Sequence, residues 1–219
     1  MVTKVVESPA AAVSGIEDGA TVMIGGFGIA GMPATLVDAL IAQGAGGLTV
    51  VCNNAGNGET GLAALLKAGR VRKIICSFPR QADSYVFDAL YRAGKVALEV
   101  VPQGTLVERI RAAGAGIGGF FTRTGFGTTL TEGKESRDIG GHHYVLEHPI
   151  HADVALIKAR TADRWGNLIY RKTARNFGPV MATAAACTIA EVSEIVQLGH
   201  LDPECIVTPG IFVHRVVAV

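Results

Sequence analysis

The chain has 219 residues, of which 49% are apolar and 18% charged, and its formal net charge is +1. A charge so close to neutral argues against a protein that binds nucleic acid or a membrane surface, and no apolar run reaches the about 20 residues needed to span a bilayer. The length and apolar content fit one compact domain over residues 1–219, and Glu7 and Pro9 stand where a secretory signal would need apolar residues.

Residues 21–114 alternate between β-rich runs and segments with helical periodicity. Strands are predicted over residues 21–26, 48–53, 73–78 and 97–103, and the helices that follow them over residues 33–44, 59–69, 82–94 and 105–114. Each predicted helix ends on a glycine, the residue type favoured just beyond a helix C-terminus. Four strand–helix units in a row indicate an α/β fold with an open, largely parallel sheet covered by helices on both faces.

The pattern changes after residue 114. Residues 115–141 are rich in Gly and Thr and too long for an ordinary connection, so a functional loop is predicted there. Further strands are expected over residues 143–148, 154–160, 167–172 and 187–192, with a helix over residues 178–186 and an extended run over residues 211–219. These elements give the fold a mixed β portion at its C-terminal end.

The stretch MIGGFGIAGMP, residues 23–33, lies between the first predicted strand and its helix. It contains the pattern G-x-G-x-x-G at Gly26, Gly28 and Gly31. A dinucleotide-binding loop needs an acidic residue at the end of the second strand, where residues 52–54 are Cys-Asn-Asn. We favour a backbone cradle, whose amide N–H groups hold a negatively charged group. A simple turn and a nicotinamide site remain the alternatives.

The segments that follow the four predicted strands share a composition. They read GGFGIAG, NNAGNG, SFPRQ and PQGT, with glycine, amides and proline in place of ordinary solvated charges. In an open parallel sheet, ligands gather outside the carboxyl ends of the strands. This edge of the sheet is therefore the predicted site.

Several longer motifs extend this prediction. GGFGIAGMP, NNAGNG, VPQGTLVERIRAAGAGIGGFF, TRTGFGT, ADVALIKA and DRWGNLIYRKTARNF follow one another along the chain. Together they resemble the alpha subunit of the family I CoA-transferases, from about residue 5 to the C-terminus. The motif TRTGFGT departs from the family pattern, because Arg123 stands where relatives have Pro.

The resemblance implies a fold of the CoA-transferase (NagB-like) type and a coenzyme A thioester as substrate, with no permanently bound cofactor. The implied reaction moves CoA from succinyl-CoA to 3-oxoadipate and yields 3-oxoadipyl-CoA and succinate, with acetoacetate or acetate as the alternative acceptor. In this family the reaction passes through a glutamyl-CoA thioester, and the glutamate belongs to the beta subunit. The resemblance therefore also implies a partner, with two copies of each subunit.

The same resemblance gives individual residues expected roles. The CoA-binding loop would comprise Gly25, Gly26, Phe27, Gly28, Ile29, Ala30 and Gly31. Asn53 and Asn54 would orient the glutamate of the beta subunit, or else form a helix cap or turn. Gln103 would hydrogen-bond the acyl carbonyl or that glutamate, or else complete an edge turn. Arg80 would bind the distal carboxylate of a dicarboxylic substrate.

Other reactive residue types have simpler interpretations. Glu59 lies nearest to a nucleophile motif, but an acidic residue at a helix start interacts favourably with the helix dipole, so no catalytic nucleophile is expected in this chain. The four histidines within residues 142–151 lack the spacing of a zinc site, and no metal is expected. The four widely spaced cysteines are typical of reduced thiols in a cytoplasmic protein.

Overall fold

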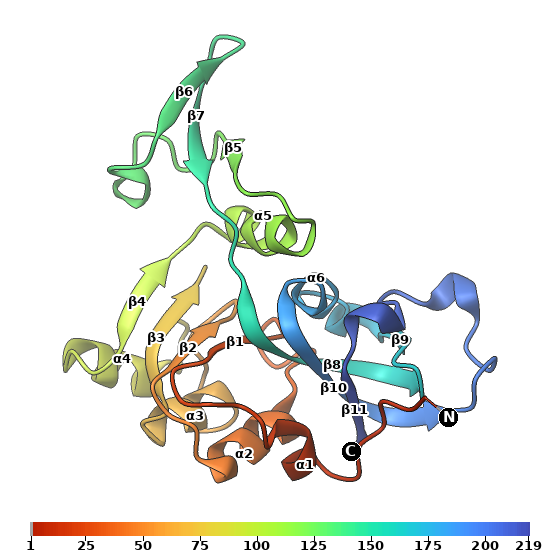
Figure 1. The fold of residues 1–219 in the computed structure, drawn as a ribbon. Coiled ribbons are helices and arrows are strands. Elements are labelled where there is room, and N and C mark those ends of the chain that lie inside the picture. Colours follow the sequence, from red (N-terminus) through yellow and green to blue (C-terminus); the bar gives the residue numbers. More distant parts are fainter. Residues whose placement is uncertain (1) are drawn as a thin grey trace.

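The computed structural model describes residues 2–219 and has an 8-stranded sheet at its centre (Figure 1). The strand order is β11-β10-β8-β1-β2-β3-β4, all neighbours in this order are parallel, and β9 pairs antiparallel with β8. The strands are β1 (Thr21–Ile24), β2 (Leu48–Val51), β3 (Val71–Cys76), β4 (Ala97–Val100), β8 (Ala152–Asp163), β9 (Leu168–Ile169), β10 (Ala185–Val196) and β11 (Arg215–Ala218). The predicted fold class is confirmed.

Helices cover both faces of this sheet (Figure 1). They are α1 (Pro9–Val13), α2 (Ala34–Gln43), α3 (Leu62–Lys67), α4 (Tyr85–Arg92), α5 (Gln103–Gly114) and α6 (Gly178–Ala182). One core cluster joins α1 to α4 with one face, and a second joins α5 and α6 with the other. The central strand β1 serves both, since Val22 and Ile24 belong to the first cluster and Met23 to the second. Burial on both faces explains its unbroken apolar run.

Several predicted boundaries are wrong, because long-range pairing decides them. The predicted helix over residues 178–186 ends at Ala182, since Ala185 already pairs with Ala152 in the long ladder between β10 and β8. The predicted strand over residues 167–172 is reduced to β9, and a 3-10 turn, η2 (Lys172–Ala174), follows it. Local propensity is a weak guide where tertiary contacts compete with it.

Two further boundaries bear on the predicted site and on the C-terminus. Gln103, expected at the end of a strand, is instead the first residue of α5, because the chain turns into the helix at Pro102. The extended run predicted over residues 211–219 begins in a 3-10 turn, η4 (Gly210–Phe212), and only β11 is strand. Another 3-10 turn, η3 (Pro203–Cys205), precedes it.

Residues 115–141, predicted to be a loop, mostly belong to a small projecting lobe (Figure 1). Its elements are β5 (Phe120–Thr122), η1 (Thr129–Thr131), β6 (Ser136–Ile139) and β7 (His142–Glu147). The three strands form an antiparallel sheet in the order β5-β7-β6. Buried Glu147 accepts a hydrogen bond from Lys134 Nζ at 2.6 Å, and Arg109 Nε of α5 donates to His148 O at 2.7 Å. These charged contacts attach the lobe to the helix layer.

None of the helices within residues 2–219 has the length and apolar character that a membrane crossing requires.

Candidate functional site

A cluster of amides lies where β2, β3 and the start of α5 meet. The Asn53 side chain, only 2% exposed, accepts hydrogen bonds through Oδ1 from Gln103 Nε2 at 2.7 Å and Ser77 Oγ at 2.9 Å. These two donors fix the orientation of the Asn53 amide. Asn53 Nδ2 has no partner within residues 2–219, and Gln103 Nε2 keeps a second N–H. The cluster can therefore offer amide donors to a ligand at this edge of the sheet.

Asn54 follows Asn53 in the sequence but contacts its own loop. Its Oδ1 accepts a hydrogen bond from Gly56 N at 2.9 Å, and its carbonyl accepts one from Cys52 Sγ at 2.9 Å. This is the turn geometry considered as the alternative for Asn54. A dinucleotide-binding fold has a carboxylate at this strand end. The neutral Asn53 oxygen, already bonded to two donors, does not suit a ribose.

Residues 25–31 form a tight turn at the carboxyl end of β1. Phe27 and Ala30 exchange two backbone hydrogen bonds, at 3.0 and 3.2 Å. Gly26 has a φ of +119°, which L side chains rarely adopt, and a Cβ on Gly31 would lie 2.7 Å from the carbonyl oxygen of Ala174. The turn is therefore shaped by its backbone and by close contact with a distant segment.

Part of the expected backbone cradle is consumed by the turn itself. The amides of Gly25, Phe27 and Ala30 donate to backbone carbonyls. The remaining N–H groups of the turn have no partner in the described part of the chain, and they are those of Gly26, Gly28, Ile29 and Gly31. The side chains of Phe27 and Ile29 are 52% and 91% exposed. The turn thus combines free amide donors with exposed apolar side chains.

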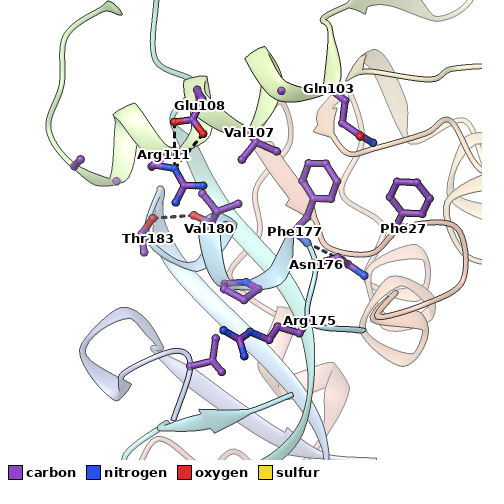
Figure 2. Close-up of a pocket in the computed structure, with 15 residues that line it drawn as sticks. Phe27, Gln103, Val107, Glu108, Arg111, Arg175, Asn176, Phe177, Val180 and Thr183 are labelled. Carbon is purple, nitrogen blue, oxygen red and sulfur yellow. Dashed lines mark hydrogen bonds and ion pairs between the residues drawn. The ribbon is translucent and has the colours of Figure 1, made fainter. Parts of the chain in front are cut away.

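A cavity of about 700 Å³ lies beside the turn, between α5 and the segment that contains α6 (Figure 2). Gln103 and Phe27 lie at one end of it, and Arg111 and Thr183 at the other. Its wall is mainly apolar and includes Val107, Phe177, Pro179, Val180 and Val207. A small-molecule site typically measures roughly 300–1,000 Å³ and has an apolar lining with few polar groups. This cavity has those properties.

Sequence reasoning did not single out Asn176 or Ser77. Asn176 Nδ2 donates to the carbonyl of Ala30 at 2.9 Å and to that of Thr173 at 2.7 Å, so it links the turn to the cavity wall. Ser77 holds Asn53 in place. Neither residue has a motif spacing that reveals its partner, although Ser77 does fall in the strand-end segment SFPRQ.

Arg80 and Glu59 each form an ion pair at the surface. Arg80 Nε lies 2.7 Å from Asp88 Oδ1, and Glu59 Oε1 lies 3.0 Å from Lys67 Nζ. The hydrogen bond from Lys67 lowers the pKa of Glu59, so this carboxylate is ionised and solvated near neutral pH. Neither Arg80 nor Glu59 lines the 700 Å³ cavity.

The cysteines near this edge are unreactive. Burial raises the pKa of the Cys52 thiol well above its ordinary value, and burial also raises the pKa of Cys76 to about 12. Both therefore remain protonated at neutral pH, whereas the thiolate is the nucleophilic form. Within the described residues, no group of three or more His, Cys, Asp or Glu side chains is arranged to hold a metal ion.

Comparison with known proteins places this geometry in a family. Residues 6–219 match the family model described as coenzyme A transferase. The chain is 69% identical over 219 residues to the alpha subunit of 3-oxoadipate CoA-transferase from Pseudomonas putida, an alignment that covers 100% of this chain and 95% of that protein. It is 50% identical over 214 residues to the corresponding subunit of the probable succinyl-CoA:3-ketoacid coenzyme A transferase from Bacillus subtilis (strain 168), covering 98% and 89%.

A solved structure shares the fold. An acyl-CoA transferase from Escherichia coli O157:H7, in a thioester complex with CoA, superposes with a TM-score of 0.89 at 23% identity, over 100% of this chain and 50% of that one. The matched family model and the two sequence relatives extend over nearly the whole chain. The chain therefore belongs to the coenzyme A transferase family.

Proposed function

We propose that this chain is the alpha subunit of a CoA-transferase that moves CoA from succinyl-CoA to 3-oxoadipate and yields 3-oxoadipyl-CoA and succinate. The observation that carries the proposal is the 69% identity, over the full chain, to the Pseudomonas putida protein named for that acceptor. The free amides at the sheet edge and the adjoining cavity supply a place for the reaction.

In this proposal the chain positions the reactants and does not supply the nucleophile. A carboxylate must attack the acyl-CoA thioester, forming an acyl anhydride and then, by return of the CoA thiolate, a glutamyl-CoA thioester. We assign this glutamate to the beta subunit, with two copies of each subunit in the complex. The solvated ion pair of Glu59 with Lys67 supports this assignment, because it leaves Glu59 away from the cavity.

The neutral donors of the site match the charges that develop. Oxyanions form at the thioester carbonyl when it is attacked, and N–H groups already in place stabilise them without reorganisation. The free amides of residues 25–31, together with Asn53 and Gln103, are suited to this role and to orienting the carboxylate of the beta subunit. The mainly apolar cavity beside α5 would receive the pantetheine arm.

Two coarser expectations belong to the same proposal. We place residues 1–219 in one functional unit, which the family match over residues 6–219 supports. We also place the protein in the cytoplasm, which the free and buried thiols of Cys52 and Cys76 support. The reaction as proposed uses CoA as a substrate and requires no permanently bound cofactor or metal.

The test is to copurify this chain with the beta subunit, then to assay both the complex and the lone chain. The complex should transfer CoA between succinyl-CoA and 3-oxoadipate, and the lone chain should not. Borohydride reduction in the presence of succinyl-CoA should inactivate the complex, and mass spectrometry should then locate the reduced glutamate in the beta subunit. Activity of the lone chain, or an adduct on Glu59, would refute the division of roles.

A second acceptor is supported by a separate observation, the 50% identity to the Bacillus subtilis protein named for 3-ketoacids. The same assay distinguishes the two candidates when acetoacetate and acetate replace 3-oxoadipate. A higher kcat/KM for 3-oxoadipate is the expected result. A higher value for acetoacetate would make the complex a succinyl-CoA:3-ketoacid transferase.

A further inference from the structure

A second, smaller cavity lies on another side of the glycine turn. It measures about 240 Å³ and is lined by Ile29 and Gly31 of the turn and by the basic side chains of Lys158, Arg160 and Arg171. This volume is below the roughly 300–1,000 Å³ of sites that enclose a whole small molecule. The cavity is therefore suited to one end group of a larger ligand.

The positive charge of this basic cavity is only partly balanced. Lys158 Nζ pairs at 2.9 Å with Oε1 of Glu191, which is 0% exposed. The other oxygen, Glu191 Oε2, accepts a hydrogen bond from Leu36 N at 3.0 Å. Both oxygens of this carboxylate are thus occupied. Arg160 and Arg171 have no ion pair or side-chain hydrogen bond with any residue from 2 to 219, so two guanidinium groups leave their donors free.

The fold brings the arginines together from separate segments. Lys158 and Arg160 lie on the same face of β8, because side chains alternate along a strand. Arg171 lies just before η2, whose Lys172 has a φ of +49°, an uncommon conformation for a residue other than glycine. Such strained backbone persists only where its surroundings fix it. The close contact between Gly31 and the Ala174 carbonyl provides that fixation.

We propose that the basic cavity is an anion subsite of the transferase, in which Arg160 and Arg171 bind a phosphate of CoA or the distal carboxylate of a dicarboxylic acid. Both groups present paired oxygens that a guanidinium binds through two N–H donors. Lys158 neutralises Glu191 and is a positioning residue. The inference rests on the proposed function, which supplies both ligands.

The experiment places the double variant Arg160→Ala/Arg171→Ala, which leaves the ion pair of Lys158 intact, in the complete complex with the beta subunit. Calorimetry compares the binding of CoA with that of pantetheine, which lacks phosphates. Steady-state kinetics compare KM for 3-oxoadipate with KM for acetoacetate, which has one carboxylate. Arg92→Ala is the matched control, because Arg92 is an exposed arginine of α4 that lines neither cavity.

Loss of the charge-assisted bonds should weaken the ligand that uses the subsite by about 10- to 100-fold. A phosphate subsite predicts weaker binding of CoA and unchanged binding of pantetheine. A carboxylate subsite predicts a higher KM for 3-oxoadipate and an unchanged KM for acetoacetate. In either case Arg160→Lys/Arg171→Lys should recover part of the loss, since it keeps both charges.

The subsite proposal is overturned if the double variant melts like the wild type and handles all four compounds as the wild type does. Equal weakening of CoA and pantetheine, or of 3-oxoadipate and acetoacetate, would also overturn it, because the effect would not depend on the anion. Failure of the proposed function has a different signature, which is a wild-type complex without transferase activity.

Discussion

Replacing Gly31 by alanine tests whether the glycine turn is held by backbone contact with the segment that contains η2. Gly31 has a φ of +76°, and an added Cβ would lie 2.7 Å from the Ala174 carbonyl oxygen and 3.1 Å from the Ala174 Cα. A left-handed backbone costs an L residue about 1–2 kcal/mol, and overpacking adds about 1–3 kcal/mol. Gly31→Ala should therefore lower the free energy of unfolding by about 2–5 kcal/mol.

Gly19 provides a matched control. Its φ of +78° is almost the same, but nothing lies within 4 Å of an added Cβ. Gly19→Ala should therefore lose only the backbone term, about 1–2 kcal/mol. The difference between the two variants in urea denaturation isolates the contact with Ala174. Equal losses would show that this contact does not hold the turn.

Transferase activity separates stability from function in the same pair of variants. The shift forced by a Cβ on Gly31 moves the free amides of the turn, and a misplacement of about 1 Å can cost on the order of 100-fold in rate. The complex that carries Gly31→Ala should lose kcat/KM to about that extent, while the complex that carries Gly19→Ala should keep it. A destabilised Gly31→Ala complex with full activity would remove the turn from the site.

Three further changes test the amide cluster, the lobe and the pH dependence. Gln103→Ala removes an amide donor and should lower kcat by roughly 100-fold, about 3 kcal/mol of transition-state stabilisation, with an unchanged urea midpoint; an unchanged kcat would contradict the proposed role. Glu147→Gln weakens the bond from Lys134 Nζ, 2.6 Å long, and should cost about 1–2 kcal/mol in urea denaturation; an unchanged midpoint would mean that this bond does not secure the lobe. Burial lowers the pKa of His214 below its ordinary 6.5, and its Nδ1 accepts a hydrogen bond from Thr188 N at 3.0 Å. As the pH falls below that value, the unfolded chain takes up more protons than the folded chain, so stability should fall. His214→Asn, which keeps an acceptor and does not titrate, should show a smaller fall between about pH 7 and 5 by denaturation; an unchanged slope would assign the pH dependence to other groups.

The sequence was sufficient to predict the units that depend on local interactions. Period-2 and period-3.6 patterns, with a glycine beyond each helix, depend on contacts between residues near one another in the chain. The four units between β1 and α5 are therefore present, with shifted ends. The predicted strand ends also led to Asn53 and Gln103, which the fold brings within 2.7 Å of each other.

Only the tertiary structure decided which residues meet across long stretches of chain. The pairing of β8 with β1, the lobe formed from residues 115–147, and the ladder that shortened α6 all join distant segments. The basic cavity has the same origin, since β8 and the segment before η2 supply its arginines separately. Side-chain patterns report how each segment is buried, but the partner of a buried face is selected by the packing of the whole chain.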